Sequence, residues 1–319
     1  MIVASGVRIG WADLPAHVRA AVEQKLGAPV VEAVSQTGGF SPGTADRVVT
    51  ATGARAFVKT ASPALNPHSY EIARQEARFS PALPPTAPVP RWLGTYDDGE
   101  WLALILEDID GRNPRTPWVE DELDAAVSGL RRLAEALTPP PVPDAPLAAD
   151  LLRFDLAGWS RIAAEPPTDL DPWVAANLGA LGAAADRGCA ALVGNTLNHC
   201  DVRADNMLLR PDGSMVFVDW PWACVGPAWL DIVMLAINVI VHGGDGDRVL
   251  ADVDPAKATD LAAGLCGYLV DVARRPPPPG LPTVRAFQRA QGDALLPWLR
   301  ERLPMGAAAH PQSQGNPAD

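Results

Sequence analysis

The sequence predicts an α+β protein with two lobes: a small antiparallel sheet with one main helix, then a larger and mostly helical half. Three observations predict this arrangement. Short β-rich segments separated by turn residues fill the chain before Leu106, helical spacing dominates after it, and one loop-and-hairpin stretch, residues 198–222, interrupts the helical half. The 319 residues are enough for one large or two modest domains.

The first lobe is expected to begin with one helix and three strands. Helical spacing and a glycine stop predict a helix over residues 17–27. Strands are predicted at residues 29–36, 46–52 and 55–61. Between the first two strands lies TGGFSPGTA, residues 37–45, a glycine-bearing turn of the kind that joins hairpin strands.

A second helix and two more strands complete this lobe. Residues 68–83 have the pattern of a helix, and a proline-rich connector follows them. Residues 91–98 and 100–109 are predicted as strands on either side of a turn at residues 97–99. We therefore place the first lobe at residues 1–107.

The second lobe, residues 108–303, is predicted to be mostly helical. Residues 119–137 have the spacing of an amphipathic helix. A hairpin is expected over residues 206–220, with its turn at residues 211–213. The polar end of the chain, residues 304–319, is expected to be disordered.

Composition limits the classes of partner. Apolar residues make up 48% of the chain and charged residues 20%, which is typical of a globular protein rather than a disordered one. A formal net charge of −12 argues against a nucleic-acid partner, whose phosphates demand a basic face. The same charge would suit a cationic small substrate, or it would only keep the protein soluble.

The cysteines and the apolar segments favour a reducing, cytoplasmic setting. The cysteines show neither the close pairs of a zinc site nor a small disulfide framework. The N-terminus lacks the basic-then-apolar pattern of a signal peptide. The longest apolar stretch, residues 228–241, contains Asp231 and is too short to span a bilayer, so no membrane partner is expected. The four cysteines are Cys189, Cys200, Cys224 and Cys266.

The stretch NHCDVRADNMLLRPDGSMVFVDWPW concentrates side chains that suit phosphoryl transfer. This chemistry needs a carboxylate to accept the proton of the attacking hydroxyl, hard oxygen ligands for magnesium, and a cation to offset charge on the transferred group. The loop offers Asp201 as the base, Arg203 as the cation and Asn206 as a neutral oxygen ligand. The following hairpin would bring Asp219 back beside them as an anionic ligand. His199 is expected to be a buried, hydrogen-bonded support of the loop.

These motifs resemble those of a known fold. HCDVRADN resembles the catalytic loop of the protein-kinase-like fold, H-x-D-x-x-x-x-N, and VDWPW falls where that fold carries its metal-binding Asp. The separation, 219 − 201 = 18 residues, matches the loop-plus-hairpin arrangement of those enzymes. The continuation ACVGPAWLDI resembles the aminoglycoside phosphotransferase and choline kinase branch, which has a second Asp here, Asp231.

The resemblance implies a bilobal protein-kinase-like fold and an enzyme that uses ATP (or GTP) and Mg²⁺. It implies that Asp201 is the catalytic base, and that Asn206 and Asp219 are magnesium ligands. Arg203 stands where protein kinases have a Lys near the transferred phosphate. Asp231 would brace the backbone of the catalytic loop from the next helix.

The nucleotide side requires a Lys on the third strand to hold the α- and β-phosphates, and a Glu on the next helix as its partner. RAFVKTA places Lys59 after an apolar strand, and the chain has only two other lysines, Lys25 and Lys257. Of the two glutamates in YEIARQEARF, we prefer Glu76 over Glu71, because RQEARF resembles the R-E-A run of the family.

Two further segments would contact the nucleotide. Gly38 and Gly39 would let their turn bring backbone amides close to phosphates, although the same pattern is equally typical of a plain hairpin turn. Leu106, Glu107 and Asp108 fall where the hinge should receive the adenine ring through backbone groups.

The resemblance implies transfer to a hydroxyl of a small molecule. The acceptor would be an aminoglycoside or other antibiotic, or a metabolite such as a sugar, amino alcohol or nucleoside-like compound. Pro221 stands on the acceptor side, where the family often has an acidic residue. Four residues could line an acceptor cleft or could be ordinary exposed helix-face residues. They are Asp155, Trp159, Glu165 and Asp171.

Two other classes of protein compete with this interpretation. A pseudokinase, which binds nucleotide without turnover, would be favoured by loss of the Lys, the base or a metal ligand, and all of these are present. A metal-dependent hydrolase using Asp201 and Asp219 would lack the usual His-rich ligand set, and it would leave Lys59 unexplained.

Overall fold

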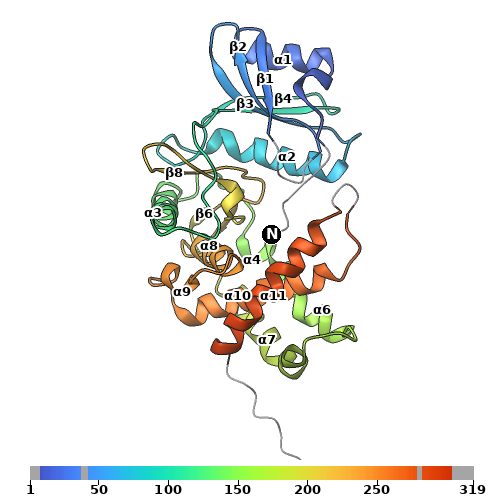
Figure 1. The fold of residues 1–319 in the computed structure, drawn as a ribbon, viewed down its shortest axis with the longest axis vertical. Helices are drawn as coiled ribbons and strands as arrows, with labels where there is room; N and C mark the ends of the chain where they lie inside the picture. Colours follow the sequence, from blue (N-terminus) through green and yellow to red (C-terminus); the bar gives the residue numbers. More distant parts are fainter. Residues whose placement is uncertain (1–7, 37–41, 279–281, 304–319) are drawn as a thin grey trace, which may run out of the picture.

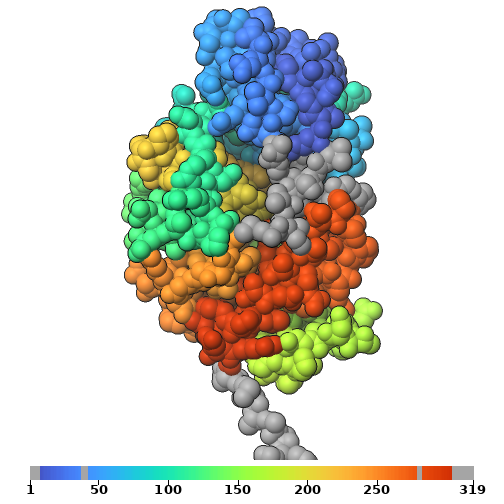
Figure 2. Space-filling view, in the orientation of Figure 1, coloured from blue at the N-terminus to red at the C-terminus, as the bar shows by residue number. Residues whose placement is uncertain are grey.

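The computed structural model describes residues 8–36, 42–278 and 282–303. Over these residues the chain forms two lobes, a sheet-containing lobe and a larger helical lobe (Figure 1). The space-filling view in Figure 2 shows the smaller lobe, in blue, standing on the larger one. The expected nucleotide-contacting glycines and the polar C-terminal segment lie outside the described residues.

One antiparallel sheet organises the first lobe, with strand order β1-β2-β3-β5-β4. Helix α1 covers one face of the sheet and helix α2 the other. All five residues of β5 are buried, since the strand is covered on both faces, and this explains its continuous apolar sequence. The elements are α1 Ala16–Leu26, β1 Val30–Ser35, β2 Ala45–Thr50, β3 Arg55–Ala61, α2 Pro67–Phe79, β4 Trp92–Asp97 and β5 Leu102–Leu106.

The alternation of side chains along β3 decides where Lys59 points. Val58 packs with α1, whereas Ala61, three residues further along the strand, packs against α2 with Leu104 of β5. Lys59 is opposite Leu104 in the register and two residues from Ala61, so it belongs to the same face. The sheet therefore directs Lys59 toward α2, the helix that carries Glu76.

Helix boundaries in this lobe follow from local chemistry. Gly27 ends α1 in a left-handed conformation, with φ of 78°. Asn66 caps α2, because its side chain accepts a hydrogen bond from the Ser69 N–H. The expected helix to residue 83 is too long: α2 ends at Phe79 and a short 3₁₀ turn follows, since Pro81 lacks the N–H needed to continue the helix.

Helices build the second lobe around α10, which packs against α7 and α11. Gly158 of α6 lies so close to α10 that a Cβ there would be 2.3 Å from the Gly267 backbone. None of the described helices is both long and apolar enough to cross a membrane. The helices are α3 Glu120–Ala136, α4 Ala148–Leu151, α5 Arg153–Leu156, α6 Gly158–Ala164, α7 Pro172–Ala190, α8 Leu230–Val241, α9 Gly246–Val249, α10 Pro255–Ala273 and α11 Val284–Arg302.

Two small ribbons interrupt this helical lobe. Strand β6 (Thr196–Asn198) pairs with β9 (Cys224–Gly226), and β7 (Met207–Leu209) pairs with β8 (Met215–Phe217). The second pair is the hairpin expected from the sequence, and Gly213 in its turn has a φ of 81°. The segments joining these ribbons contain Asp201 and Asp219, so the ribbons fix the ends of the two segments that carry the motif aspartates.

Candidate active site

The loop between β6 and β7 is held from below by Asp231 of α8. The Asp231 carboxylate accepts hydrogen bonds from the backbone N–H groups of His199, at 2.8 Å, and Cys200, at 2.9 Å. Cys200 has a φ of 63°, a left-handed conformation that a residue with a Cβ rarely adopts. The two hydrogen bonds stabilise this strained turn, and they confirm the expected bracing by Asp231.

His199 is a support, as expected, and it is fully buried. Its Nδ1 accepts a hydrogen bond from the Asp201 N–H at 3.2 Å, so its Nε2 carries the hydrogen and donates to the Val218 carbonyl at 2.9 Å. The ring also meets Trp220 edge-on, with 4.7 Å between ring centroids. His199 therefore ties the loop of Asp201 to the strand end that precedes Asp219.

Asp201 lies at the centre of a polar cluster. Its carboxylate accepts hydrogen bonds from Arg203 Nη1 at 3.2 Å and from Asn206 Nδ2 at 2.9 Å. Arg203 also makes a two-pronged contact with Asp205, at 3.0 and 2.9 Å. Burial raises the pKa of Asp201, and the charge of Arg203 opposes that rise. The loop thus presents one oriented carboxylate beside a fixed cation.

Lys59 joins the two lobes. Its Nζ lies 2.5 Å from a carboxylate oxygen of Glu76 and 2.6 Å from one of Asp219, which is 160 residues away in the chain. Burial acts to lower the pKa of Lys59, but the two carboxylates outweigh it and raise the pKa above its usual value. Glu71, the alternative partner, is exposed and lies near Arg74. The preference for Glu76 is therefore confirmed by the geometry.

Asp219 occupies a strained backbone conformation, with a φ of 72°. Such left-handed positions are unusual outside glycine and concentrate at functional sites. Burial acts to raise the pKa of Asp219, but the charge of Lys59 outweighs it and holds the pKa below its usual value. Asp219 is therefore ionised at neutral pH, and its side chain is 42% exposed.

The chemistry of Asn206 and Asp219 fits magnesium. The Asn206 amide nitrogen donates to two oxygens of Asp201, which fixes the amide so that its oxygen remains for another partner. Asp219 has one oxygen on Lys59 and a second that can bind a cation. Among the described residues there is no group of three or more His, Cys, Asp or Glu side chains that could hold a metal by itself. This donor set suits Mg²⁺, which usually takes few protein ligands and completes its shell with water and phosphate oxygens.

The three expected hinge residues have different roles. Leu106 is buried at the end of β5. The Glu107 N–H donates to the Arg91 carbonyl at 2.8 Å, so this N–H is already used within the protein. The Asp108 carboxylate is buried between Arg47, at 2.8 Å, and Arg55, at 2.6 Å. The Asp108 side chain thus ties the hinge to β2 and β3.

The expected phosphate-binding glycines, Gly38 and Gly39, fall outside the described residues, but the end of their turn is defined. Gly43 has a φ of 132°, and a Cβ there would lie 2.0 Å from the Thr60 carbonyl oxygen. Only glycine fits so close to β3. Arg8 was not predicted from the sequence. Burial lowers the pKa of Arg8, and the negative charge of Asp219 opposes this change. Arg8 therefore interacts electrostatically with Asp219.

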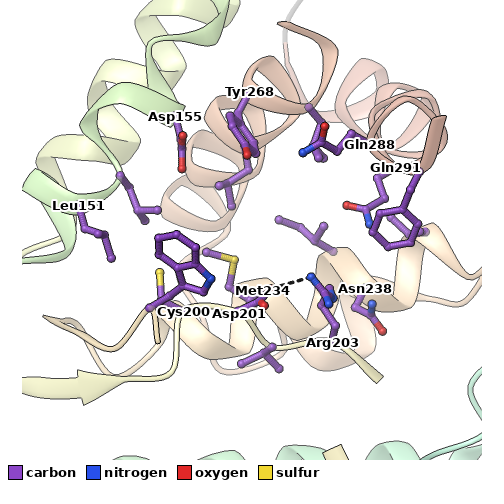
Figure 3. Close-up of a pocket in the computed structure, with 18 of the residues that line it drawn as sticks. Leu151, Asp155, Cys200, Asp201, Arg203, Met234, Asn238, Tyr268, Gln288 and Gln291 are labelled. Atoms are coloured by element: carbon purple, nitrogen blue, oxygen red, sulfur yellow. Dashed lines mark hydrogen bonds and ion pairs between the residues drawn. The ribbon is translucent and has the colours of Figure 1, made fainter. Parts of the chain in front are cut away.

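A cavity of about 500 Å³ opens beside Asp201 and Arg203 (Figure 3). Residues of α4 and α5, the loop of Asp201, α8, α10 and α11 line it, and we call it the acceptor pocket after the role proposed for it below. Most of these residues are apolar or aromatic. The lining residues are Leu151, Leu152, Phe154, Asp155, Cys200, Asp201, Val202, Arg203, Trp222, Met234, Ile237, Asn238, Val241, Leu265, Tyr268, Leu269, Val284, Phe287, Gln288 and Gln291.

Only one of the four expected cleft residues, Asp155, lines this pocket. Trp159 is buried in the core, where its ring N–H donates to the Ala263 carbonyl at 2.7 Å. Asp171 caps α7 by accepting from two backbone N–H groups, and Glu165 is exposed where α6 ends. Trp159, Glu165 and Asp171 therefore do not line this pocket, and Glu165 is the exposed helix-end residue that the sequence also allowed. Their polar or aromatic character serves capping, packing and solvation instead.

Comparison with known proteins identifies the family. A sequence model of a protein family, described as "Phosphotransferase enzyme family", matches residues 37–265, more than two thirds of the chain. The chain belongs to the phosphotransferase enzyme family. The matched segment of this phosphotransferase contains Lys59, the catalytic loop and Asp219. No curated protein matches the chain.

Solved structures confirm the protein-kinase-like bilobal fold expected for this phosphotransferase. The aminoglycoside phosphotransferase APH(4)-Ia, in a ternary complex with ADP and hygromycin B, aligns with a TM-score of 0.56 at 13% identity, covering 90% of this chain and 99% of that one. The choline kinase LicA from Streptococcus pneumoniae aligns with a TM-score of 0.58 at 13% identity, covering 88% and 100%. An aminoglycoside phosphotransferase from Alicyclobacillus acidocaldarius gives 0.51 at 15% identity, covering 86% and 92%.

Proposed function

We propose that this phosphotransferase moves the γ-phosphoryl group of ATP, bound with Mg²⁺, to a hydroxyl of a small molecule. The observation that carries the proposal is the bridge from Glu76 through Lys59 to Asp219, which joins the two lobes next to the loop of Asp201. An ordinary structural ion pair would not need two carboxylates on one lysine beside a third, oriented one. In phosphoryl transfer each of these groups has a separate task.

The tasks follow from the contacts. Asp201 accepts the proton of the attacking hydroxyl. As it does so, the hydroxyl oxygen bonds to the γ-phosphorus, and the bond between this phosphorus and the oxygen that leaves with ADP breaks. Asn206 and Asp219 would hold Mg²⁺, which when bound would offset the charge of the phosphate oxygens. Lys59 exchanges part of its contact with Asp219 for the α- and β-phosphates, while Glu76 keeps it oriented. Arg203, fixed by Asp205, supplies positive charge beside the transferred group.

The nucleotide is assigned to the first lobe and the hinge. The Glu107 N–H already donates to the Arg91 carbonyl. Adenine would therefore form hydrogen bonds with the remaining backbone groups of Glu107 and Asp108. The fold neighbour crystallised with ADP supports an adenine nucleotide. One fold neighbour was crystallised with hygromycin B and another is a choline kinase. Antibiotic and metabolite acceptors are therefore both supported.

ATP hydrolysis without acceptor separates an enzyme from a pseudokinase. The wild-type protein should hydrolyse ATP slowly and only with Mg²⁺. Asp201→Asn should lower this rate by about 10²–10⁴-fold, the usual contribution of a general base, and should leave nucleotide binding unchanged. Asp252→Asn, an exposed position paired with Arg131, is the control for lost charge. Equal hydrolysis by wild type and Asp201→Asn would remove Asp201 as the base, and no hydrolysis at all would favour the pseudokinase.

A further inference from the structure

The acceptor pocket is poor in charge for a protein with a net charge of −12. Three of its described lining residues are charged: Asp155, Asp201 and Arg203. Asp201 and Arg203 contact each other, and Arg203 is also held by Asp205. The charges of Asp201 and Arg203 therefore already pair with each other, and both side chains have proposed tasks in phosphoryl transfer. Asp155 is the one remaining charged lining residue in the described part of the chain.

Asp155 is a carboxylate without a partner. No hydrogen bond or ion pair of its side chain is found within the described residues. The charge of Arg161 acts to lower the pKa of Asp155, but the Arg161 side chain donates a hydrogen bond to Asp271, at 2.7 Å. Burial raises the pKa of Asp155 to about 6. The group is therefore mostly ionised at neutral pH. An ionised carboxylate held in a partly apolar wall is stabilised by a cation or a hydrogen-bond donor.

Apart from Asp155, Asp201 and Arg203, the lining residues in the described part of the chain carry no charge. Asp155 and Tyr268 lie together at one side of the pocket, and Gln288 and Gln291 of α11 lie across from them (Figure 3). The amides of α11 and of Asn238 are neutral. Aromatic and aliphatic side chains make up most of the remaining surface, and a volume of about 500 Å³ suits a drug-sized molecule.

We propose that the acceptor is an amphipathic small molecule with a single amine: its apolar body fills the pocket, its amine pairs with Asp155, and its hydroxyl reaches Asp201. This proposal rests on the proposed phosphotransferase function and narrows its substrate class. A polycationic aminoglycoside is a poor acceptor here, since each further ammonium would be desolvated against an apolar wall without a partner.

The test compares binding of three probe sets to the protein with Mg²⁺ and ADP, by titration calorimetry. The first set is aryl amino alcohols with one amine and one secondary hydroxyl, propranolol and analogues with smaller rings. The second set is the same compounds with the amine acetylated, and the third is kanamycin and neomycin. The amines should bind at least about 10-fold more tightly than their acetylated forms, as expected for a charge-assisted contact. They should also bind more tightly than the polycations.

Variants locate the effect. Asp155→Asn should remove the difference between the amines and their acetylated forms. Asp150→Asn, an exposed acid on the neighbouring helix that pairs with Arg153, changes the net charge equally and should leave the difference intact. Gln288→Glu adds a second carboxylate across the pocket and should improve polycation binding. Tightest binding by the polycations in wild type, or an unchanged amine preference in Asp155→Asn, would overturn the proposal.

Phosphate transfer is measured separately with the same probes by mass spectrometry. Higher kcat/KM for kanamycin than for the aryl amino alcohols would overturn the acceptor class while the phosphotransferase function stands. Amine-selective binding that depends on Asp155, with no Mg²⁺-dependent ATP hydrolysis, would support the pocket assignment and contradict the proposed function.

Discussion

The catalytic cleft and the acceptor pocket lie side by side and are built in opposite ways. In the cleft, acidic and basic side chains are paired at short range: Lys59 with Glu76 and Asp219, and Asp201 with Arg203. In the pocket, apolar walls surround one unpaired carboxylate, Asp155. In the proposed function the reaction would depend on charges at fixed positions, whereas the choice of acceptor would depend on shape and on how few charges are present. Changes in the two regions should therefore have separable effects.

The largest effect is expected from Lys59→Met. This change removes the cation proposed to hold the nucleotide phosphates and leaves Glu76 and Asp219 without their shared partner. We expect kcat/KM for ATP to fall by about 10²–10³-fold, as when one electrostatic donor is lost from a transition state. Steady-state kinetics with varied ATP provide the measurement. Lys257→Met, at an exposed position in α10, is the control, and a similar loss there would show that the effect is not local.

Asp231→Asn should affect stability and turnover together. An amide offers one oxygen where the carboxylate accepts from two backbone N–H groups, so one buried N–H loses its partner. We expect the free energy of unfolding to fall by about 1–3 kcal/mol. Denaturant unfolding measures this change, and kcat should fall with little change in the affinity for the acceptor. A variant with lower kcat but unaltered unfolding would contradict the bracing role.

The pH dependence of kcat should follow Asp201. Because burial raises the pKa of Asp201, the base becomes protonated, and kcat falls, at a higher pH than for an ordinary aspartate. Arg203 opposes this rise, so Arg203→Gln should move the acid limb to still higher pH. The measurement is kcat against pH at saturating ATP and acceptor. An acid limb that stays in place in Arg203→Gln would show that another group controls it.

Trp222→Ala should give the smallest change, and only on the acceptor side. Trp222 is 38% exposed and lines the pocket, so its removal takes away apolar contact without opening the core. We expect the KM for the acceptor to rise by about 5–20-fold, the equivalent of roughly 1–2 kcal/mol of lost burial. The KM for ATP should stay within twofold, about the error of such a comparison. An equal rise in the KM for the acceptor and the KM for ATP would contradict the claim that changes in the cleft and in the pocket have separable effects.

The sequence predicted the cleft far better than the pocket, and the reason is physical. Asp201, Asn206 and Asp219 are polar residues at fixed spacings in one short stretch, and Lys59 lies in a strand whose alternation sets its direction. Such patterns can be recognised in a sequence because phosphoryl transfer permits few other residue types at these positions. The five strands of the sheet were predicted on the same basis of apolar alternation and turns.

The pocket carries no comparable signal. Met234, Leu265 and Phe287 come from three helices, and each has the ordinary apolar character of a core residue until the helices pack around a space. Trp159 was one of four residues that could line an acceptor cleft, but it is buried inside the lobe. Arg8 was missed because a lone arginine near a chain end has no motif. Only tertiary packing separates a lining residue from a core residue.

The central claim is that Asn206 and Asp219 hold Mg²⁺ with the nucleotide in the cleft. The most direct measurement is ATP affinity with and without Mg²⁺, by titration calorimetry, for wild type, Asp219→Asn and the surface control Asp252→Asn. Asparagine tolerates the left-handed backbone at this position, so the variant changes charge rather than fold. Mg²⁺ should tighten binding in wild type and in the control, and should have no effect in Asp219→Asn. A Mg²⁺ effect of equal size in Asp219→Asn would contradict the claim.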